Sequence, residues 1–165
     1  MHDSEATETR ELMTRLNAYW TQTNVSIRPG SSDLEIEAFE SRYYVRLPAD
    51  LREYFATIGG MEENTFDENM FSFIPRNGVK SIPEELVHFC GLPDYTRIIK
   101  SIPDPSHWFV IVDYLISSAV FAIRLERVFD DTPVMVIYDG TNYRVVASSF
   151  ANFLEAYLSN PLGLL

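Results

Sequence analysis

The sequence predicts an α+β domain, with helices at both ends of the chain packed on a central antiparallel β-sheet. Two observations predict this class. Apolar residues recur with helical spacing over residues 4–58 and again after residue 149, whereas short runs rich in Val, Ile and Phe occupy residues 70–147. Strands that follow one another without alternating helices are typical of α+β rather than α/β folds. We expect the helices to cover one face of the sheet.

The first expected helix covers residues 4–22. Leu12, Leu16 and Tyr19 recur at helical spacing, and acidic residues near the amino end of this segment interact favourably with the helix dipole. Residues 24–31 contain a Pro-Gly pair and predict a loop. The amino-terminal 30 residues are therefore expected to form one helix and a connection to the rest of the domain.

A pair of short helices is expected on either side of Pro48. Ser32 and Glu35 have the spacing of a capping box, in which each side chain bonds the backbone N–H of the other residue. Pro48 suits the start of the second helix because the first helical N–H groups have no partner within the helix. Gly59-Gly60 is expected to end that helix in left-handed backbone. The apolar residues of the pair are Ile36, Phe39, Tyr43, Leu51, Tyr54, Phe55 and Ile58.

The middle of the chain predicts a meander of strands. Asp139-Gly140, between two of the expected strands, is a strong signal for a hairpin. Residues 83–87 predict one or two helical turns, and residues 91–106, which contain three prolines, predict mostly loop. A closing helix is expected from a cap at Ser148 or Ser149 to a stop at Asn160-Pro161. The expected strands are residues 70–75, 108–113, 119–126, 133–138 and 143–147.

The charge balance excludes several classes of partner. The chain has 165 residues, the length of one domain, and its 24 acidic and 13 basic residues give a net charge of −11. Nucleic acids and anionic membranes are disfavoured, because binding to either depends on clustered Lys and Arg. A basic protein partner remains open. The single cysteine, Cys90, and the absence of a signal-peptide pattern predict a cytoplasmic protein.

Catalytic and ligand motifs are missing from the sequence. It contains no glycine-rich phosphate loop, no HExxH, no CxxC and no GxSxG. We therefore predict no catalytic residue, no metal site and no cofactor. His88 and His107 flank the proline-rich stretch and could line a small-molecule pocket, but a catalytic histidine needs an oriented partner. Asp113, inside an apolar strand, is expected to face outward or to bond the turn near Ser117.

The densest acidic cluster comprises Glu62, Glu63, Asp67 and Glu68. It lies in residues 53–75, which contain five acids and no base. The spacing lacks the alternating ligands and central glycine of an EF-hand calcium loop. A solvated loop is the simplest interpretation, since charge runs usually face water, and docking of a basic protein is the functional alternative.

Several segments resemble the SUKH superfamily, the Smi/Knr-like group of bacterial toxin-immunity proteins and fungal cell-wall regulators. The resemblance covers about residues 31–158 and is most specific in the helix–Leu-Pro–helix element around Pro48. Two positions depart from the family pattern: Tyr44 replaces a common Gly, and Ile58 replaces a common Asn. Because left-handed backbone is unfavourable for Tyr, the first helix of the pair is expected to end differently. The matching segments are residues 33–40, 45–55, 59–60, 71–75, 112–114, 120–123 and 148–154.

The resemblance implies a single, non-enzymatic protein-binding domain. The leading hypothesis is an immunity protein that binds and neutralises a bacterial toxin, such as a basic nuclease. The alternatives are a regulatory scaffold with no toxin partner and, more remotely, a small-molecule sensor or enzyme with a pocket near His88 and His107. For the leading hypothesis, the predicted contact residues are Glu62, Glu63, Asp67 and Glu68, joined by Asp130 and Asp131.

Overall fold

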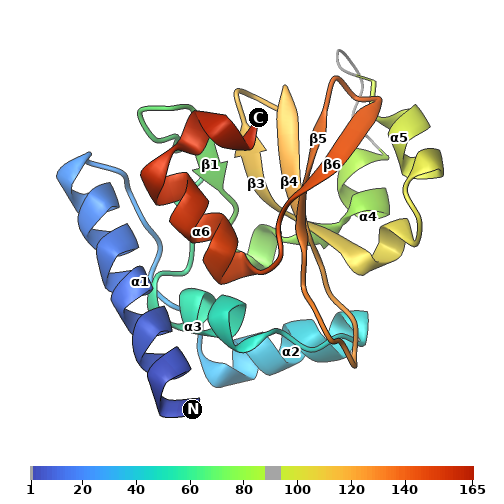
Figure 1. The fold of residues 1–165 in the computed structure, drawn as a ribbon. Coiled ribbons are helices and arrows are strands. Elements are labelled where there is room, and N and C mark those ends of the chain that lie inside the picture. Colours follow the sequence, from blue (N-terminus) through green and yellow to red (C-terminus); the bar gives the residue numbers. More distant parts are fainter. Residues whose placement is uncertain (1, 88–93) are drawn as a thin grey trace.

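The computed structural model describes residues 2–87 and 94–165, which form an antiparallel six-stranded sheet with helices on both sides (Figure 1). The strands lie in the order β1-β3-β4-β5-β6, and β2 pairs with β3 beyond the end of β1. The α+β prediction is confirmed. The helices are α1 His2–Gln22, α2 Asp33–Tyr43, α3 Ala49–Thr57, α4 Ile82–Leu86, α5 Thr96–Ser101 and α6 Phe150–Ser159; the strands are β1 Phe71–Phe73, β2 Lys80–Ser81, β3 Trp108–Tyr114, β4 Ala119–Arg124, β5 Val134–Tyr138 and β6 Asn142–Ala147.

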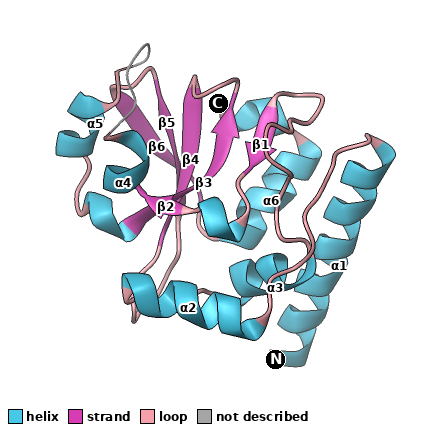
Figure 2. Ribbon diagram, turned by 180° about the vertical axis from the view of Figure 1, so that it is seen from behind, coloured by secondary structure: helices cyan, strands magenta, loops and turns pink. Residues whose placement is uncertain are grey.

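Helices cover both faces of the sheet, so the expectation of one covered face is wrong. Helices α1, α2, α3 and α6 enclose the main core, whereas α4 and α5 enclose a smaller core behind the sheet (Figure 2). Strand β4 shows the reason: Phe121 and Ile123 pack into the main core, while Val120 and Ala122 pack into the smaller one. Successive side chains of a strand point to opposite faces of the sheet. A strand with consecutive apolar residues therefore buries all of its apolar surface only when both faces are covered. Among the described helices, none is long and apolar enough to cross a membrane.

The corner between α2 and α3 forms as the local sequence predicts. The capping box is confirmed: the Ser32 hydroxyl accepts from the Glu35 N–H at 3.3 Å, and the Glu35 carboxylate accepts from the Ser32 N–H at 2.8 Å. Helix α2 ends at Tyr44, whose φ of 55° is left-handed. The helix thus keeps the ending that suits glycine, although a side chain there costs about 1 kcal/mol, so the expectation that this helix ends differently is wrong. Gly59, at φ 77°, directly follows the C-cap Ile58 of α3, and a Cβ there would lie 2.2 Å from the Pro29 carbonyl oxygen.

One segment of the proline-rich stretch is helical rather than loop. Helix α5 lies between the prolines, with Pro103 following it, so no proline interrupts its hydrogen bonds. Ile98 and Ile102 are buried in the smaller core, and this packing stabilises a helix too short to persist alone. The expected loop at residues 91–93, together with His88 and Cys90, lies outside the described residues.

Two turns of the meander match their predictions. Asp139 and Gly140 have φ values of 60° and 68° and, together with Thr141, form the three-residue connection of the β5–β6 hairpin, in which Tyr138 pairs with Asn142. Asp113 accepts hydrogen bonds from the Ser117 N–H at 2.8 Å and from the Ser117 hydroxyl at 2.6 Å. Its carboxylate therefore stabilises the turn between β3 and β4, as expected.

Candidate partner-binding surfaces

The acidic loop, residues 62–68, presents three of its four predicted contact residues to solvent. Glu62, Glu63 and Glu68 are exposed. The Glu62 carboxylate lies 4.0 Å from the Arg28 guanidinium, and the Glu68 carboxylate accepts a hydrogen bond from the Tyr19 hydroxyl at 2.9 Å. Both contacts lie at the surface, where ion pairs are worth at most about 1 kcal/mol. These three carboxylates remain available to a partner.

Asp67 is buried, so its prediction as a contact residue is wrong. Only 4% of Asp67 is exposed. One carboxylate oxygen accepts from the N–H groups of Asn69 and Phe71, both at 2.8 Å, and the other accepts from the Tyr157 hydroxyl. The Tyr157 oxygen in turn accepts from the Trp20 indole N–H at 3.0 Å. Asp67 therefore ties the acidic loop to β1, α6 and α1, and no carboxylate surface is left for a partner.

Burial and the neighbouring carboxylate have a clear effect on Tyr157. Loss of solvent raises the pKa of the Tyr157 hydroxyl far above its ordinary value, and the hydrogen bond to Asp67 raises it further. The hydroxyl is therefore a permanent donor to Asp67 over the physiological range of pH. The network of Asp67, Tyr157 and Trp20 is therefore structural. The number of acidic residues near position 67 in the sequence does not distinguish a buried acid of this kind from an acid on a solvated loop.

Asp130 and Asp131 do not extend the acidic loop. Both are exposed, but they lie on the connection between β4 and β5, at the opposite end of the molecule from residues 62–68 (Figures 1 and 2). The structure therefore does not bring together the two acidic segments that the sequence hypothesis combined.

His107 sits at the surface and faces an acid rather than a pocket. Its Nδ1 atom lies 3.3 Å from the Glu126 carboxylate, and 48% of its side chain is exposed. Neither of the two hollows that the structure shows includes His107, and His88 is outside the described residues. Within residues 2–87 and 94–165, no group of three His, Cys, Asp or Glu side chains is placed to hold a metal ion.

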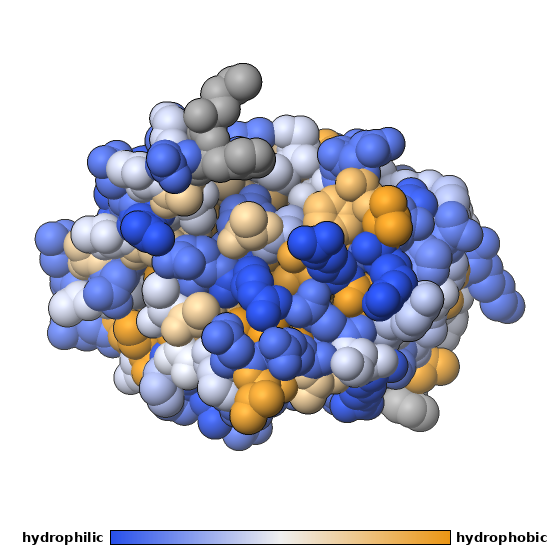
Figure 3. Space-filling model, turned by 90° about the horizontal axis from the view of Figure 1, so that it is seen from below, coloured by the Kyte–Doolittle hydropathy of each residue, from blue (hydrophilic) through white to orange (hydrophobic). Residues whose placement is uncertain are grey.

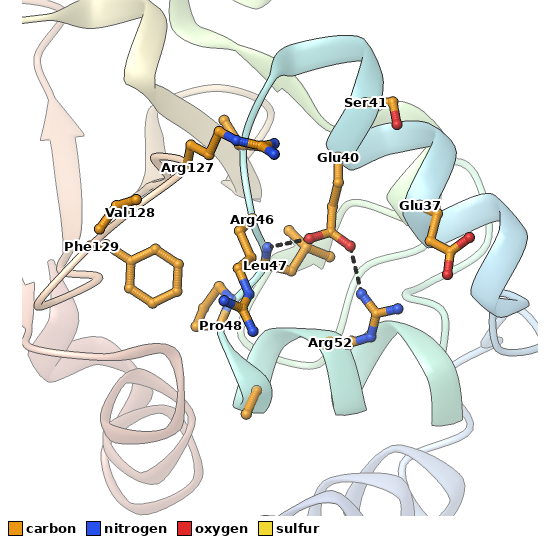
Figure 4. Close-up of a pocket in the computed structure, with 12 residues that line it drawn as sticks. Glu37, Glu40, Ser41, Arg46, Leu47, Pro48, Arg52, Arg127, Val128 and Phe129 are labelled. Atoms are coloured by element: carbon orange, nitrogen blue, oxygen red, sulfur yellow. Dashed lines mark hydrogen bonds and ion pairs between the residues drawn. The ribbon is translucent and has the colours of Figure 1, made fainter.

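A second surface, absent from the sequence hypothesis, is a hollow of about 960 Å³ beside α2, which we call the arginine groove. It lies between α2, the linker to α3, the start of α3, and the loop that follows β4 (Figure 4). On the face that carries α2 and α3, apolar patches lie next to strongly hydrophilic side chains (Figure 3). The lining residues are Glu37, Glu40, Ser41, Val45, Arg46, Leu47, Pro48, Ala49, Arg52, Arg127, Val128 and Phe129.

Glu40 organises one wall of the groove. Its carboxylate accepts from the Leu47 N–H at 3.0 Å and from the Arg52 guanidinium at 2.5 Å (Figure 4). A backbone bond from the Arg46 N–H to the Glu126 carbonyl, 3.0 Å long, fixes the linker against the loop after β4. The two bonds to the Glu40 carboxylate are charge-assisted, which makes them short and geometrically specific. The walls of the groove are therefore fixed before any partner binds.

The opposite wall carries cations without anionic partners. Within the described part of the chain, neither Arg46 nor Arg127 makes an ion pair. The Arg127 guanidinium instead lies 4.5 Å from the centre of the exposed Tyr44 ring, a cation–π contact. Sequence reasoning missed this surface because residues 46 and 127 are distant in the chain and meet only when the loop after β4 folds against the linker.

Comparison with known proteins supports the resemblance seen in the sequence. The SMI1 / KNR4 family (SUKH-1) model matches residues 30–156 of the chain. The match runs from the loop before α2 to near the end of α6, so it includes both the acidic loop and the arginine groove. A search of curated proteins finds no match.

Proposed function

The chain belongs to the SMI1/KNR4 family (SUKH-1), and on this premise we propose that it is a non-enzymatic protein-binding domain that binds and neutralises a toxin protein. The observation that carries the proposal is the family match over most of the domain. The target we propose is a toxin domain with a basic surface, such as a nuclease. In the cell, the two proteins would meet in the cytoplasm.

The exposed acids of the chain suit such a target. A nuclease needs cationic side chains to hold a polyanionic substrate, and a net charge of −11 attracts them from a distance. Glu62, Glu63 and Glu68 project from one loop without strong internal partners. Long-range attraction of this kind raises the association rate and weakens as salt screens it.

The test expresses the products of the genes that flank this one, tests each for toxicity, and measures association of a toxic product with the chain by stopped flow over a series of salt concentrations. The variant E62K/E63K/E68K is expected to slow association at low salt by at least about tenfold. The matched control E5K/E8K/E11K reverses three exposed acids near the start of α1 and is expected to have a smaller effect. Failure of the wild-type protein to bind the toxin contradicts the neutralising role. Salt-independent association contradicts the charge-steered docking.

A regulatory scaffold is the second candidate, and one observation favours it. The molecule has two surfaces of opposite charge at different ends, a geometry that suits simultaneous contact with two proteins. This function predicts a ternary complex in which occupation of the acidic loop leaves the arginine groove free. Size-exclusion chromatography with two captured partners distinguishes it from a purely inhibitory role, which requires only a binary complex.

A further inference from the structure

We propose that the arginine groove binds an acidic, extended peptide segment of a protein partner, with Arg46 and Arg127 contacting carboxylates and Val128 contacting an apolar side chain between them. This inference goes beyond the proposed toxin neutralisation and does not depend on it. The acidic loop and the groove lie at different ends of the molecule, so either surface can fail its test while the other passes.

The charges that face the groove leave a cationic excess. Glu40 already accepts two hydrogen bonds, one of them from Arg52, so this pair is neutral overall. Arg46 and Arg127 make no ion pair with described residues, and Glu37 at the rim is the remaining unpaired acid of the lining. An arginine fork binds a carboxylate through two parallel hydrogen bonds, which makes a peptide acid a good match.

The rim of the groove also exposes apolar surface that contributes nothing to either core. Val128 is 86% exposed and Tyr44 is 70% exposed, and both adjoin Arg127. Arginine and tyrosine are both enriched at the centres of protein interfaces, and here the two side chains contact each other at the surface. Tyr44 holds this position despite its left-handed backbone, φ 55°.

A peptide fits this composition better than a nucleic acid does. Phosphates occur at every nucleotide, so a polynucleotide would bring some of them close to Glu37 and Glu40 and meet the net charge of −11. A peptide can place carboxylates opposite the two arginines and neutral residues opposite the two glutamates. The volume of about 960 Å³ is at the upper end of the range for small-ligand sites, so the groove accommodates several side chains.

The experiment measures fluorescence anisotropy of a labelled decapeptide that alternates Glu with Leu, added to the full chain. A control peptide in which every Glu is replaced by Gln has a similar shape but no negative side chains, so it separates the contribution of charge to binding from that of shape. We expect the acidic peptide to bind, the glutamine peptide to bind at least about tenfold more weakly, and R46E/R127E to lose at least about tenfold in affinity for the acidic peptide. Val128→Ser is expected to weaken binding several-fold.

The matched control is R10E/R97E, which reverses two exposed arginines that also make no ion pair in the described chain. It changes the net charge by the same amount and is expected to bind within about twofold of wild type. Three results overturn the proposal: no binding of the acidic peptide, equal losses in R46E/R127E and R10E/R97E, or tighter binding of a single-stranded oligonucleotide than of the peptide. Self-association of the wild-type chain that R46E/R127E abolishes also overturns it, since the occupant is then a second copy.

Discussion

The acidic loop and the arginine groove carry opposite charges at different ends of the molecule, and their charged groups are used differently. In the loop, the acid with the most hydrogen bonds, Asp67, is buried and structural, whereas its three glutamates are exposed and have at most one surface contact each. In the groove, Glu40 and Arg52 neutralise each other and hold the wall, while Arg46 and Arg127 make no ion pair with any residue that the structure describes. In both regions, a charged side chain is available to a binding partner only if residues of the same chain do not already neutralise or bury it. The number of charged residues nearby in the sequence does not determine this.

The largest effect is expected at Asp67. Replacing Asp67 by Ala leaves the Phe71 N–H and the Tyr157 hydroxyl buried without acceptors, which should lower the free energy of unfolding by about 3 kcal/mol. Glu63→Ala, a control in the same loop, should change it by less than about 0.5 kcal/mol. Urea denaturation measures both. Equal stability of the two variants would show that Asp67 is no more structural than its neighbours.

A pair of buried tyrosines tests the same network from its other side. The Tyr157 hydroxyl bonds Asp67 and Trp20, so Tyr157→Phe should cost about 2 kcal/mol of unfolding free energy. The Tyr54 hydroxyl is equally buried but has no hydrogen-bond partner among the described residues. Tyr54→Phe should therefore leave stability unchanged or raise it by up to about 1 kcal/mol. The interpretation fails if Tyr54→Phe destabilises the protein as much as Tyr157→Phe.

Tyr44 links stability to the groove. Glycine relieves the left-handed backbone, so Tyr44→Gly should raise the unfolding free energy by about 1 kcal/mol while weakening binding of the acidic peptide, because Arg127 loses its aromatic contact. Tyr44→Ala removes the ring but keeps the unfavourable φ. It should therefore bind as weakly as the glycine variant without the gain in stability. Denaturation and anisotropy on the same samples check both parts, and equal stability of the two variants contradicts the backbone argument.

The smallest effect concerns the pH dependence at Asp50, a partly buried acid outside both surfaces. Burial raises the pKa of the Asp50 carboxyl, although the N–H groups of Ala151 and Leu51 donate to it and act in the opposite direction. A raised folded pKa contributes stability at low pH that is lost as the pH rises. The free energy of unfolding of the wild type, compared with that of Asp50→Asn, should thus fall as the pH rises above about 4, the ordinary pKa of Asp in the unfolded chain. The difference should become constant once the pH exceeds the pKa of Asp50 in the folded protein.

Stability curves of the wild type and Asp50→Asn between about pH 3.5 and pH 7 measure this difference. A constant difference across that range would show that the amide hydrogen bonds fully offset burial. The same comparison at Glu63, which is exposed, provides a reference for a carboxylate without burial.

Local sequence predicted the elements well where one or two residues determine the backbone. The capping box at Ser32, the turn at Asp139-Gly140 and the cap at Ser149 depend only on neighbouring residues, and all three are present. Burial of both sheet faces is also predictable from the sequence, because β4 is apolar at every position before Arg124. The α+β class alone favours one covered face, whereas this strand pattern favours two.

The remaining features depend on contacts between distant residues. Asp67 is buried because Tyr157, ninety positions away, donates to it, and no window around the acidic cluster contains that information. Helix α5 is stabilised by the smaller core rather than by its own six residues. The arginine groove needs residue 127 to lie against residue 44, which requires the whole sheet to have formed.

The most direct test of the account measures binding of the neighbouring toxin and of the acidic peptide to the same three proteins: wild type, E62K/E63K/E68K and R46E/R127E. The account predicts a crossed result, in which the loop variant loses association with the toxin by at least about tenfold but keeps the peptide, and the groove variant loses the peptide but keeps the toxin. Two results would contradict the claim that separate surfaces recognise different partners. One is a variant that loses both ligands, and the other is that both variants bind both ligands as well as wild type.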